Sequence, residues 1–499
     1  MNNLINSTTA SSSLPSQTSS PINSGDTAWV LISGALVMLL APSLGFFYGG
    51  LVRQKNILST IMQAYAIYAV CGIVWALLGF SLAFGPTSGH FIGDSTYFGM
   101  RNINDQPLDY APTVPGMAFF FLQQGFCNIT PPLAMGGPAE RFSMITSCLF
   151  SAIWIIIVYC PLAHWIWADG GWARNMGAID FAGGTAVHMS AGWAALILSL
   201  VIGKRKDDSV IKPPNASFTV LGAGLLWWGL FGFNGGSAGM GNYQASLAVN
   251  NTNIAASTAA IGWAIIDYLH DKHTSGSGIA IGSVCGLIAI TPGSGYVVPW
   301  SSFIIGFVGG IISNYMTRLR IKTKYVDDAL DVFACHGATG TWGVFALGLF
   351  ADNSNLPSGR MGAFFGDGYT LAYEICIICT CIGWTCFWTF VIAYTMKHYG
   401  LLRISPEAEE TGLDLWELEE QVYVVVPALE GDAKSMNMGS SSTAIANRIV
   451  HVLTPYGIHE KPGNSRQPSE IAMKEMKPEP IPQASPRPEA SIQIAVKPI

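Results

Sequence analysis

Long apolar runs separated by short polar connections dominate the chain from residue 28 to residue 397. A run of roughly 17–25 apolar residues is long enough to cross a membrane as a helix. We expect eleven such helices, over residues 28–52, 58–84, 115–137, 143–166, 182–203, 216–237, 246–269, 276–293, 299–317, 333–351 and 371–396. The seventh run is the weakest, because Asn250, Asn251 and Asn253 dilute its apolar character. The pattern predicts an all-α polytopic membrane protein with eleven transmembrane helices.

Basic residues in the connections predict the orientation of these helices. Membrane proteins keep Lys and Arg of short loops on the cytoplasmic side. The connections after the first, third, fifth, seventh and ninth runs carry Arg53, Lys55, Arg141, Lys204, Arg205, Lys206, Lys212, Lys272, Arg318, Arg320, Lys322 and Lys324. The opposite connections carry only Arg101, Arg174 and Arg360. We therefore expect the N-terminus outside and the C-terminus inside.

Polar segments flank the apolar region of residues 28–397. Residues 1–27 are rich in Ser, Thr and Asn, lack the pattern of a cleaved signal peptide and carry a glycosylation sequon at Asn6, so we expect them outside the cell. Residues 398–499 form an expected cytoplasmic regulatory tail. The tail is acidic through Tyr423, where short helices could form, and we predict it to be largely disordered after about residue 430. Candidate phosphorylation sites in it are Ser435, Ser440, Ser441, Ser442 and Thr443.

The composition agrees with a membrane protein and excludes an average soluble one. Hydrophobic residues make up 50% of the chain and charged residues 11%, whereas an average soluble protein carries about 25% charged residues. The 55 glycines favour a tightly packed bundle, because small residues let membrane helices approach closely. The ten cysteines all fall in apolar runs. We interpret them, Cys376 and Cys379 included, as small hydrophobic residues rather than a disulfide framework or a redox pair.

A carboxylate and an imidazole recur at the same spacing in each half of the apolar region. Asp180 stands eight residues before His188, Asp328 stands eight residues before His336, and a glycine follows each histidine at the fourth position. An ionisable side chain at membrane depth is unfavourable by roughly 2.5–3.5 kcal/mol, which makes it a candidate functional residue. The matching segments predict an internal repeat of the first five and the next five helices, inverted because each half has an odd number. The eleventh helix is then an addition to the repeat.

The two histidines are the first candidates for chemistry. A neutral imidazole has one donor and one acceptor nitrogen. Two facing imidazoles could share a proton and line a narrow apolar path, or they could relay a proton, since histidine titrates near neutrality. A metal site is the alternative for His188 and His336, but it would need further ligands that the sequence does not offer nearby. We expect no metal and no other cofactor.

Further polar and aromatic residues lie at the expected outer ends of several of these helices. Asp180 could cap the start of its helix, and its charge could also favour a cation near an outer mouth, and these two roles are compatible. Trp167 ends the fourth run, where a Trp is usually an interface anchor. Ser237 and Phe233 are four residues apart and share a helical face. Converging Trp, Phe and Ser side chains would instead suit a small cation, with roughly 0.5–2 kcal/mol of cation–π attraction per ring.

The chain resembles the ammonium transporter family (Amt/Mep/Rh), on its Amt/Mep branch, from about Trp29 to about Tyr423. Several matching motifs at the correct order and spacing make the resemblance specific. They are Gly45-Phe46-Phe47-Tyr48-Gly49-Gly50-Leu51, Ala139-Glu140-Arg141, Asp180-Phe181-Ala182-Gly183-Gly184 with His188, Phe233-Asn234-Gly235-Gly236-Ser237, Asp327-Asp328 with His336-Gly337, and Gly412-Leu413-Asp414. Residues 418 and 419 depart from the family's tail pattern, since Leu418 and Glu419 stand where it often has His-Gly.

The resemblance implies a role for each candidate residue. It places Trp167, Ser237 and Phe126 at an external ammonium-recruitment site and makes Phe126 and Phe233 the stacked gate of a pore. It makes His188 and His336 the twin histidines of that pore, and Asp180 the essential aspartate at the start of its helix. Asp328, the counterpart of Asp180 in the second repeat, is expected to give structural support. The family also implies a homotrimer with one pore in each subunit.

The expected function is therefore ammonium transport. An ammonium-sized ion is costly to dehydrate, so we expect the ion to lose its proton near the gate and to cross as ammonia, with or without the proton. Expected partners are ammonium or ammonia, methylammonium as a further candidate, the lipid bilayer, and a kinase or regulatory protein at the tail, with no nucleic acid. The expected location is a eukaryotic plasma membrane.

An ammonium sensor signalling through residues 401–499 is the alternative function, and a metal-dependent membrane enzyme is a third hypothesis. A potassium channel is disfavoured because no carbonyl-filter motif occurs.

Overall fold

A computed structural model describes residues 22–207, 214–354, 359–420 and 422–423. The predictions for the polar N-terminal segment through residue 21, including glycosylation at Asn6, lie outside the described residues. So do the predicted disorder after about residue 430 and the candidate phosphorylation sites of the tail.

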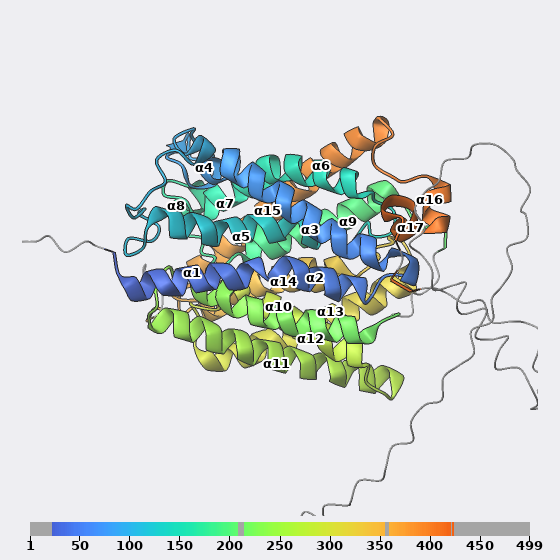
Figure 1. Ribbon diagram of the computed structural model, residues 1–499. Helices are drawn as coiled ribbons and strands as arrows, with labels where there is room; N and C mark the ends of the chain where they lie inside the picture. The colour runs from blue at the N-terminus through green and yellow to red at the C-terminus, as the bar shows by residue number, and fades with distance from the viewer. Residues whose placement is uncertain (1–21, 208–213, 355–358, 421, 424–499) are drawn as a thin grey trace, which may run out of the picture. The chain divides into compact units, whose positions relative to one another are not determined.

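Helices occupy almost all of the predicted apolar runs in the first half of the chain, and they run side by side along one direction (Figure 1). They are α1 (Ser24–Met38), α2 (Leu40–Gly49), α3 (Ile57–Val74), α4 (Phe80–Phe84), α5 (Gly116–Ala134), α6 (Met144–Trp154), α7 (Cys160–Trp167), α8 (Trp172–Met176) and α9 (Ser190–Ile202). Short π-helical segments join several of them, namely η2 (Trp75–Gly79), η4 (Ile155–Tyr159) and η5 (Gly184–Met189).

The second half is helical in the same way. Its helices are α10 (Ala216–Gly236), α11 (Tyr243–Asp271), α12 (Gly276–Ile290), α13 (Pro299–Thr323), the π-helical η7 (Phe333–Ala338), α14 (Thr339–Phe350) and α15 (Gly368–His398). The run diluted by asparagines forms α11, a continuous helix of 29 residues. Asn251 is fully buried in α11, and its side-chain amide donates to the backbone carbonyls of Ser294 and Val297, so a polar residue is satisfied inside the bundle.

Short elements complete the described chain. They are the 3-10 turns η1 (Gln54–Asn56), η3 (Phe98–Met100), η6 (Thr291–Gly293) and η8 (Ala363–Phe365), a two-stranded hairpin of β1 (Thr87–Ser88) and β2 (Ile92–Gly93), and the helices α16 (Pro406–Thr411) and α17 (Leu413–Leu418). The α8 helix and the loop that follows α4 lie at one end of the bundle, whereas α16 and α17 lie at the other end (Figure 1).

Within the described residues, seven helical stretches are long and apolar enough to span a membrane. They cover Ser24–Gly49, Gln54–Phe84, Met144–Met176, Gly184–Ile202, Ala216–Gly236, Gly276–Gly293 and Gly368–His398. The structure is thus that of an all-α membrane protein. Eleven crossings, the inverted repeat and the orientation of the termini remain predictions.

All ten cysteines are free thiols. Six of them are buried, while Cys376 and Cys379 are exposed on the apolar surface of α15. The interpretation of the cysteines as small apolar residues rather than a disulfide framework agrees with this arrangement.

The segment after α15 packs against the α3 end of the bundle. Asp414, in α17, accepts hydrogen bonds from the backbone N–H groups of Leu58 (3.0 Å) and Ser59 (2.7 Å), at the start of α3. The backbone N–H of Leu413 donates to the side chain of Asn56 (2.8 Å). Because the first N–H groups of a helix have no partner within that helix, α17 supplies the acceptors that α3 lacks.

Candidate functional site

Each predicted aspartate accepts hydrogen bonds from the backbone at the start of a histidine-bearing helical segment. Asp180 accepts from the N–H groups of Gly183 (2.8 Å), Gly184 (2.9 Å) and Thr185 (2.7 Å). Asp328 accepts from the N–H of Phe333 (2.7 Å). In both segments the carboxylate accepts a hydrogen bond from the backbone N–H five residues further on. The structure therefore supports the capping interpretation of Asp180 and gives Asp328 a similar geometry.

The histidines lie in π-helical segments rather than in regular α-helix. His188 belongs to η5 and His336 to η7, each six residues long. A π-helical segment widens the helix locally and is frequent at functional sites. The apolar pattern predicts a continuous helix at both places and contains no signal for the widened turns.

The two histidine-bearing helices cross with their backbones in contact. A Cβ atom added at Gly192 would lie 2.0 Å from the backbone nitrogen of Gly337, and one added at Gly340 would lie 3.1 Å from that of Met189. Only glycine permits the closer of these approaches. The glycine four residues after each histidine thus has a structural reason, which is to let the two segments meet.

This crossing brings the two imidazoles together. The Nδ1 atoms of His188 and His336 are 3.4 Å apart, and the ring centroids are 5.5 Å apart. The Nε2 atom of His188 is buried without a hydrogen-bond partner among the residues that the structure describes. No group of three or more His, Cys, Asp or Glu able to hold a metal occurs in this described part of the chain.

A continuous series of aromatic contacts leads from Trp167 to the histidine pair. The indole of Trp167 meets the edge of Phe126 with centroids 6.1 Å apart, and Phe126 stacks on Phe233 at 3.9 Å. Phe233 then lies 5.7 Å from the ring of His188. Both phenylalanines are buried, so their stacked rings fill the space between Trp167 and the histidines.

Two further predicted residues adjoin this series. The indole Nε1–H of Trp167 donates to the backbone carbonyl of Asp180 (2.9 Å), which ties the tryptophan to the turn before η5. Ser237 is half-buried one helical turn beyond Phe233, and its hydroxyl donates to the Phe233 carbonyl (2.8 Å). The structure thus brings Trp167, Phe126 and Phe233 into contact and leaves Ser237 bonded to its own helix.

A small apolar cavity of about 20 Å³ adjoins the histidine pair. Apart from His188 and His336, its lining is apolar and consists of Leu40, Leu44, Phe47, Ile129, Leu133, Leu226, Leu230, Phe233, Val284, Leu287 and Ile288. A cavity needs about 10–15 Å³ of such volume to hold one water molecule. The site therefore has room for roughly one molecule of that size.

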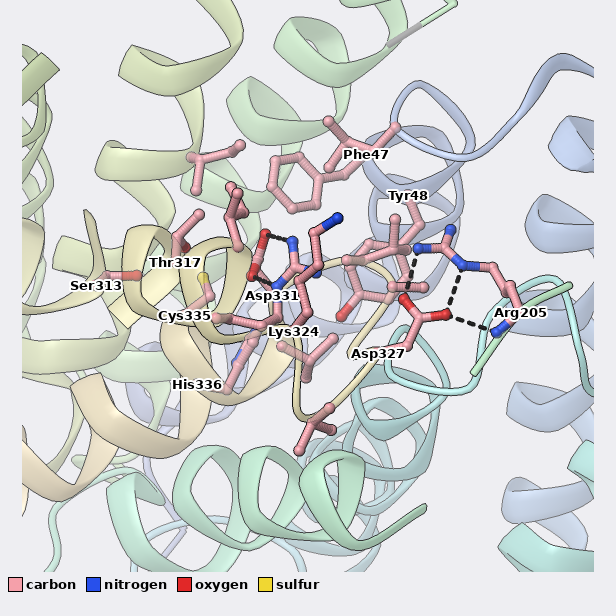
Figure 2. A pocket seen from close by; sticks show the side chains of 18 of the residues that line it. Phe47, Tyr48, Arg205, Ser313, Thr317, Lys324, Asp327, Asp331, Cys335 and His336 are labelled. Carbon is pink, nitrogen blue, oxygen red and sulfur yellow. Dashed lines mark hydrogen bonds and ion pairs between the residues drawn. The ribbon is translucent and has the colours of Figure 1, made fainter. Parts of the chain in front are cut away.

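A larger cavity of about 230 Å³, the vestibule, begins where His336 ends the small one. Figure 2 shows His336 and Cys335 on one side of it, with Arg205 and Asp327 on the other. Its charged lining residues are Lys204, Arg205, Arg320, Lys324, Asp327 and Asp331. His336 and Phe47 thus line both the small apolar cavity and the larger, charged vestibule.

Four of the charged lining residues, Arg205, Asp327, Arg320 and Asp331, are held in ion pairs. Arg205 donates to Asp327 through two nitrogens, at 2.6 and 2.8 Å, and Arg205 also pairs with Glu140 (2.9 Å). Burial alone would raise the pKa of Asp327, but the hydrogen bond from Arg205 and the charge of Arg141 lower it to about 2. Asp327 is therefore an anion over the whole physiological pH range.

Sequence reasoning missed one ionisable residue beside the site. Glu374 of α15 is fully buried and accepts a hydrogen bond from the backbone N–H of Ile179 (2.8 Å), next to Asp180. A signal for it existed, because Glu374 is the one acidic residue inside the run 371–396. The apolar lining of the small cavity carried no signal, since its residues are ordinary members of apolar runs.

Fold and site define a class of protein: a helical membrane protein with two stacked phenylalanine rings beside a pair of buried imidazoles. Comparisons with known proteins make this specific, since the profile of the Ammonium Transporter Family matches residues 28–423. The chain belongs to the ammonium transporter family, on the branch that includes the Mep2 structures.

Similar proteins include transporters from a bacterium and from fungi. An ammonium transporter of Bacillus subtilis is 40% identical over 400 residues, which are 80% of this chain and 98% of that protein. Ammonium transporter 1 of Schizosaccharomyces pombe is 40% identical over 80% of this chain and 82% of its own length. The crystal structure of Saccharomyces cerevisiae Mep2 superposes with a TM-score of 0.73 at 32% identity, over 78% of this chain and 91% of that one. These relatives are transporters, so the chain is not an enzyme.

Proposed function

We propose that this protein recruits ammonium near Trp167, Ser237 and Phe126, removes its proton, and conducts ammonia past His188 and His336. The proposal is carried by one observation, the unbroken series of rings from Trp167 to the facing imidazoles. The aromatic end suits a cation, whereas the cavity beyond the rings is small and apolar. Ammonium must therefore lose its proton where the aromatic surroundings give way to the apolar cavity.

Dehydration sets the order of these steps. Moving an ammonium-sized ion into a medium of low dielectric costs about 20 kcal/mol in the idealised limit and several kcal/mol in real proteins. Ammonia carries no charge and avoids this cost. The buried Nε2 of His188 offers one polar contact to a small molecule in the cavity. If the proton also crosses, the imidazole pair is its route, because the Nδ1 atoms lie 3.4 Å apart.

The proposal includes the membrane context. The candidate spans together with α5, α11, α13 and the joined η7 and α14 make eleven crossings, in two inverted groups of five with α15 added. The basic connections after the odd-numbered crossings put α16, α17 and the vestibule in the cytoplasm and α8 outside. A homotrimer in a eukaryotic plasma membrane, glycosylated at Asn6, completes the proposal.

Current measurements on purified protein in liposomes test the mechanism. After an ammonium jump on a solid-supported membrane, we expect a current from the wild type and its loss in His188→Ala and His336→Ala. The matched control is His270→Ala, since His270 is exposed on α11 away from the path. Internal alkalinisation without current would mean a neutral ammonia path. The absence of both a current and a pH change would contradict transport.

A sensory role is the second candidate, and the contact between α17 and α3 favours it. Asp414 links the tail to the start of a helix of the bundle. A structure described as a sensor Amt protein superposes with a TM-score of 0.73 at 27% identity. A pure sensor would keep its signal in His188→Ala while losing it when residues 401–499 are deleted.

A further inference from the structure

The carboxyl group of Glu374 lies in an apolar part of the bundle, and only one of its two oxygen atoms has a hydrogen-bond partner among the described residues. Its side chain is 0% exposed. Its Oε1 accepts the 2.8 Å hydrogen bond from the Ile179 N–H, whereas its Oε2 is buried without a hydrogen-bond partner in the described part of the chain. A buried polar group left unsatisfied in a native protein calls for an explanation.

The Ile179 N–H belongs to the turn that precedes η5, and that turn is held at three points. The Phe181 N–H donates to the carbonyl of Pro292 (2.9 Å), and the Asp180 carbonyl receives the indole N–H of Trp167 (2.9 Å). Glu374 supplies the third point from α15. The position of Asp180, and through it that of Trp167, therefore depends on the carboxyl group of Glu374.

Burial and a neighbouring carboxylate favour the neutral form of Glu374. Asp180 is that neighbour, because Glu374 binds the N–H of Ile179, the residue that precedes Asp180. Two cations near this end of α15 in the fold have other contacts, since Arg174 pairs with Asp169 (2.8 Å) and Arg360 lies 5.0 Å from the centre of the Tyr373 ring. An isolated buried carboxylate is strongly unfavourable, and a second negative charge beside Asp180 would add repulsion.

We propose that Glu374 is a positioning residue of the ammonium path and works as a neutral carboxylic acid. Its Oε1 fixes the turn that carries Asp180, and its Oε2 holds a proton. Asp180 receives three backbone N–H groups, whereas Glu374 receives one, so a negative charge is better stabilised on Asp180 than on Glu374. When Glu374 loses its proton at alkaline pH, the turn carries two adjacent charges and loosens. The inference rests on the proposed transport function.

Two substitutions separate this role from a merely structural one. Glu374→Gln keeps a neutral side chain with an acceptor oxygen, whereas Glu374→Leu leaves the Ile179 N–H unsatisfied. We expect methylammonium uptake by Glu374→Gln to stay within about twofold of the wild type at slightly acidic pH. We expect the KM of Glu374→Leu to rise about tenfold or more, since an unsatisfied buried donor is costly.

The pH profile tests the proton itself. The ratio of uptake by Glu374→Gln to uptake by the wild type should rise at alkaline pH, because only the wild type has a proton to lose. Dividing by the wild type cancels the titration of the substrate. Glu407→Gln, on an exposed residue of α16, is the matched control and should show a constant ratio. A constant ratio in Glu374→Gln would overturn the neutral-acid proposal.

Amide hydrogen exchange measures the turn without relying on transport. In the purified full-length protein, peptides covering residues 178–185 should exchange as slowly in Glu374→Gln as in the wild type, and faster in Glu374→Leu. Equal exchange in all three proteins would overturn the positioning role. If the wild type transported neither ammonium nor methylammonium, the proposed function would fail, and the exchange result would still decide the role of Glu374.

Discussion

Asp180 and Asp328 occupy matching positions in their segments, yet they hold different numbers of backbone groups. Asp180 receives three N–H groups at distances of 2.7 to 2.9 Å, whereas Asp328 receives the N–H of Phe333 at 2.7 Å and interacts further only with the N–H of Val332 among the described backbone groups. The Oδ1 atom of Asp328 is buried and has no hydrogen-bond partner among the described residues. The start of η5 is thus more firmly held than the start of η7.

This difference predicts unequal costs for removing the two carboxylates. Asp180→Ala leaves three buried donors unsatisfied and should lower the stability by about 2–4 kcal/mol, whereas Asp328→Ala should cost about 1–2 kcal/mol. Asp180→Asn keeps the oxygen that serves two of the three donors and should lie between them. Thermal unfolding of the three purified variants in detergent measures the order of their stabilities. An Asp328→Ala protein less stable than Asp180→Ala would contradict it.

The ion pairs of the vestibule predict how stability responds to acid. The pKa of Asp327 falls from its ordinary value of 3.8 to about 2, so the folded state gains stability from the charged form above pH 3.8. That contribution should disappear as the pH falls from about 4 to about 2. Asp327→Asn should be less stable at neutral pH and show a flatter stability curve in this window. Acid unfolding followed by tryptophan fluorescence measures both effects, with the exposed Asp109→Asn as control.

At the scale of elements, the crossing of the two histidine helices depends on very small side chains. A Cβ atom at Gly192 would overlap the backbone of Gly337, whereas one at Gly340 would make a tight but tolerable contact with Met189. The apolar and polar pattern predicted these helices and the repeated spacing of their histidines. It could not predict the π-helical turns or the stacking of Phe126 on Phe233, because both arise from contacts between helices far apart in the sequence.

The crossing predicts a graded response to alanine substitution. Gly192→Ala should lower the stability by about 3 kcal/mol and abolish transport, because the backbones must separate and the imidazoles move apart. Gly340→Ala should be milder, and Gly224→Ala should be neutral, since an added Cβ there meets nothing within 4 Å. Uptake assays and thermal unfolding measure the series. Normal uptake by Gly192→Ala would show that the crossing is not required.

At the scale of the whole molecule, the tail segment 405–418 is part of the folded structure. Asp414 is only 1% exposed, and Lys55 donates to the backbone carbonyl of Glu409 (2.8 Å). The residue pattern predicted an acidic segment in which short helices could form, but the register of α17 on α3 depends on tertiary contacts that no periodicity encodes. Glu374 escaped prediction for a different reason, since a single acidic residue in an apolar run indicates a site without indicating its neighbours.

The contact of the tail with α3 predicts the effect of Asp414→Ala. Removing the carboxylate leaves the N–H groups of Leu58 and Ser59 without their acceptor and should weaken the contact by about 1–2 kcal/mol. Hydrogen exchange in residues 405–418 should become faster. Glu410→Ala is the control, because its side chain is exposed and only its backbone carbonyl binds Lys55. Unchanged exchange in Asp414→Ala would contradict the capping role of α17.

The backbone contact at Gly192 also limits how the protein can work. A carrier whose halves rock about a central site must open a gap on alternate sides of that site. Here such rocking would have to separate or slide two helices that touch without intervening side chains. In the proposed transport path the histidine pair is then a fixed constriction, and opening and closing of that path would involve the rings of Phe126 and Phe233 on one side and the charged vestibule on the other.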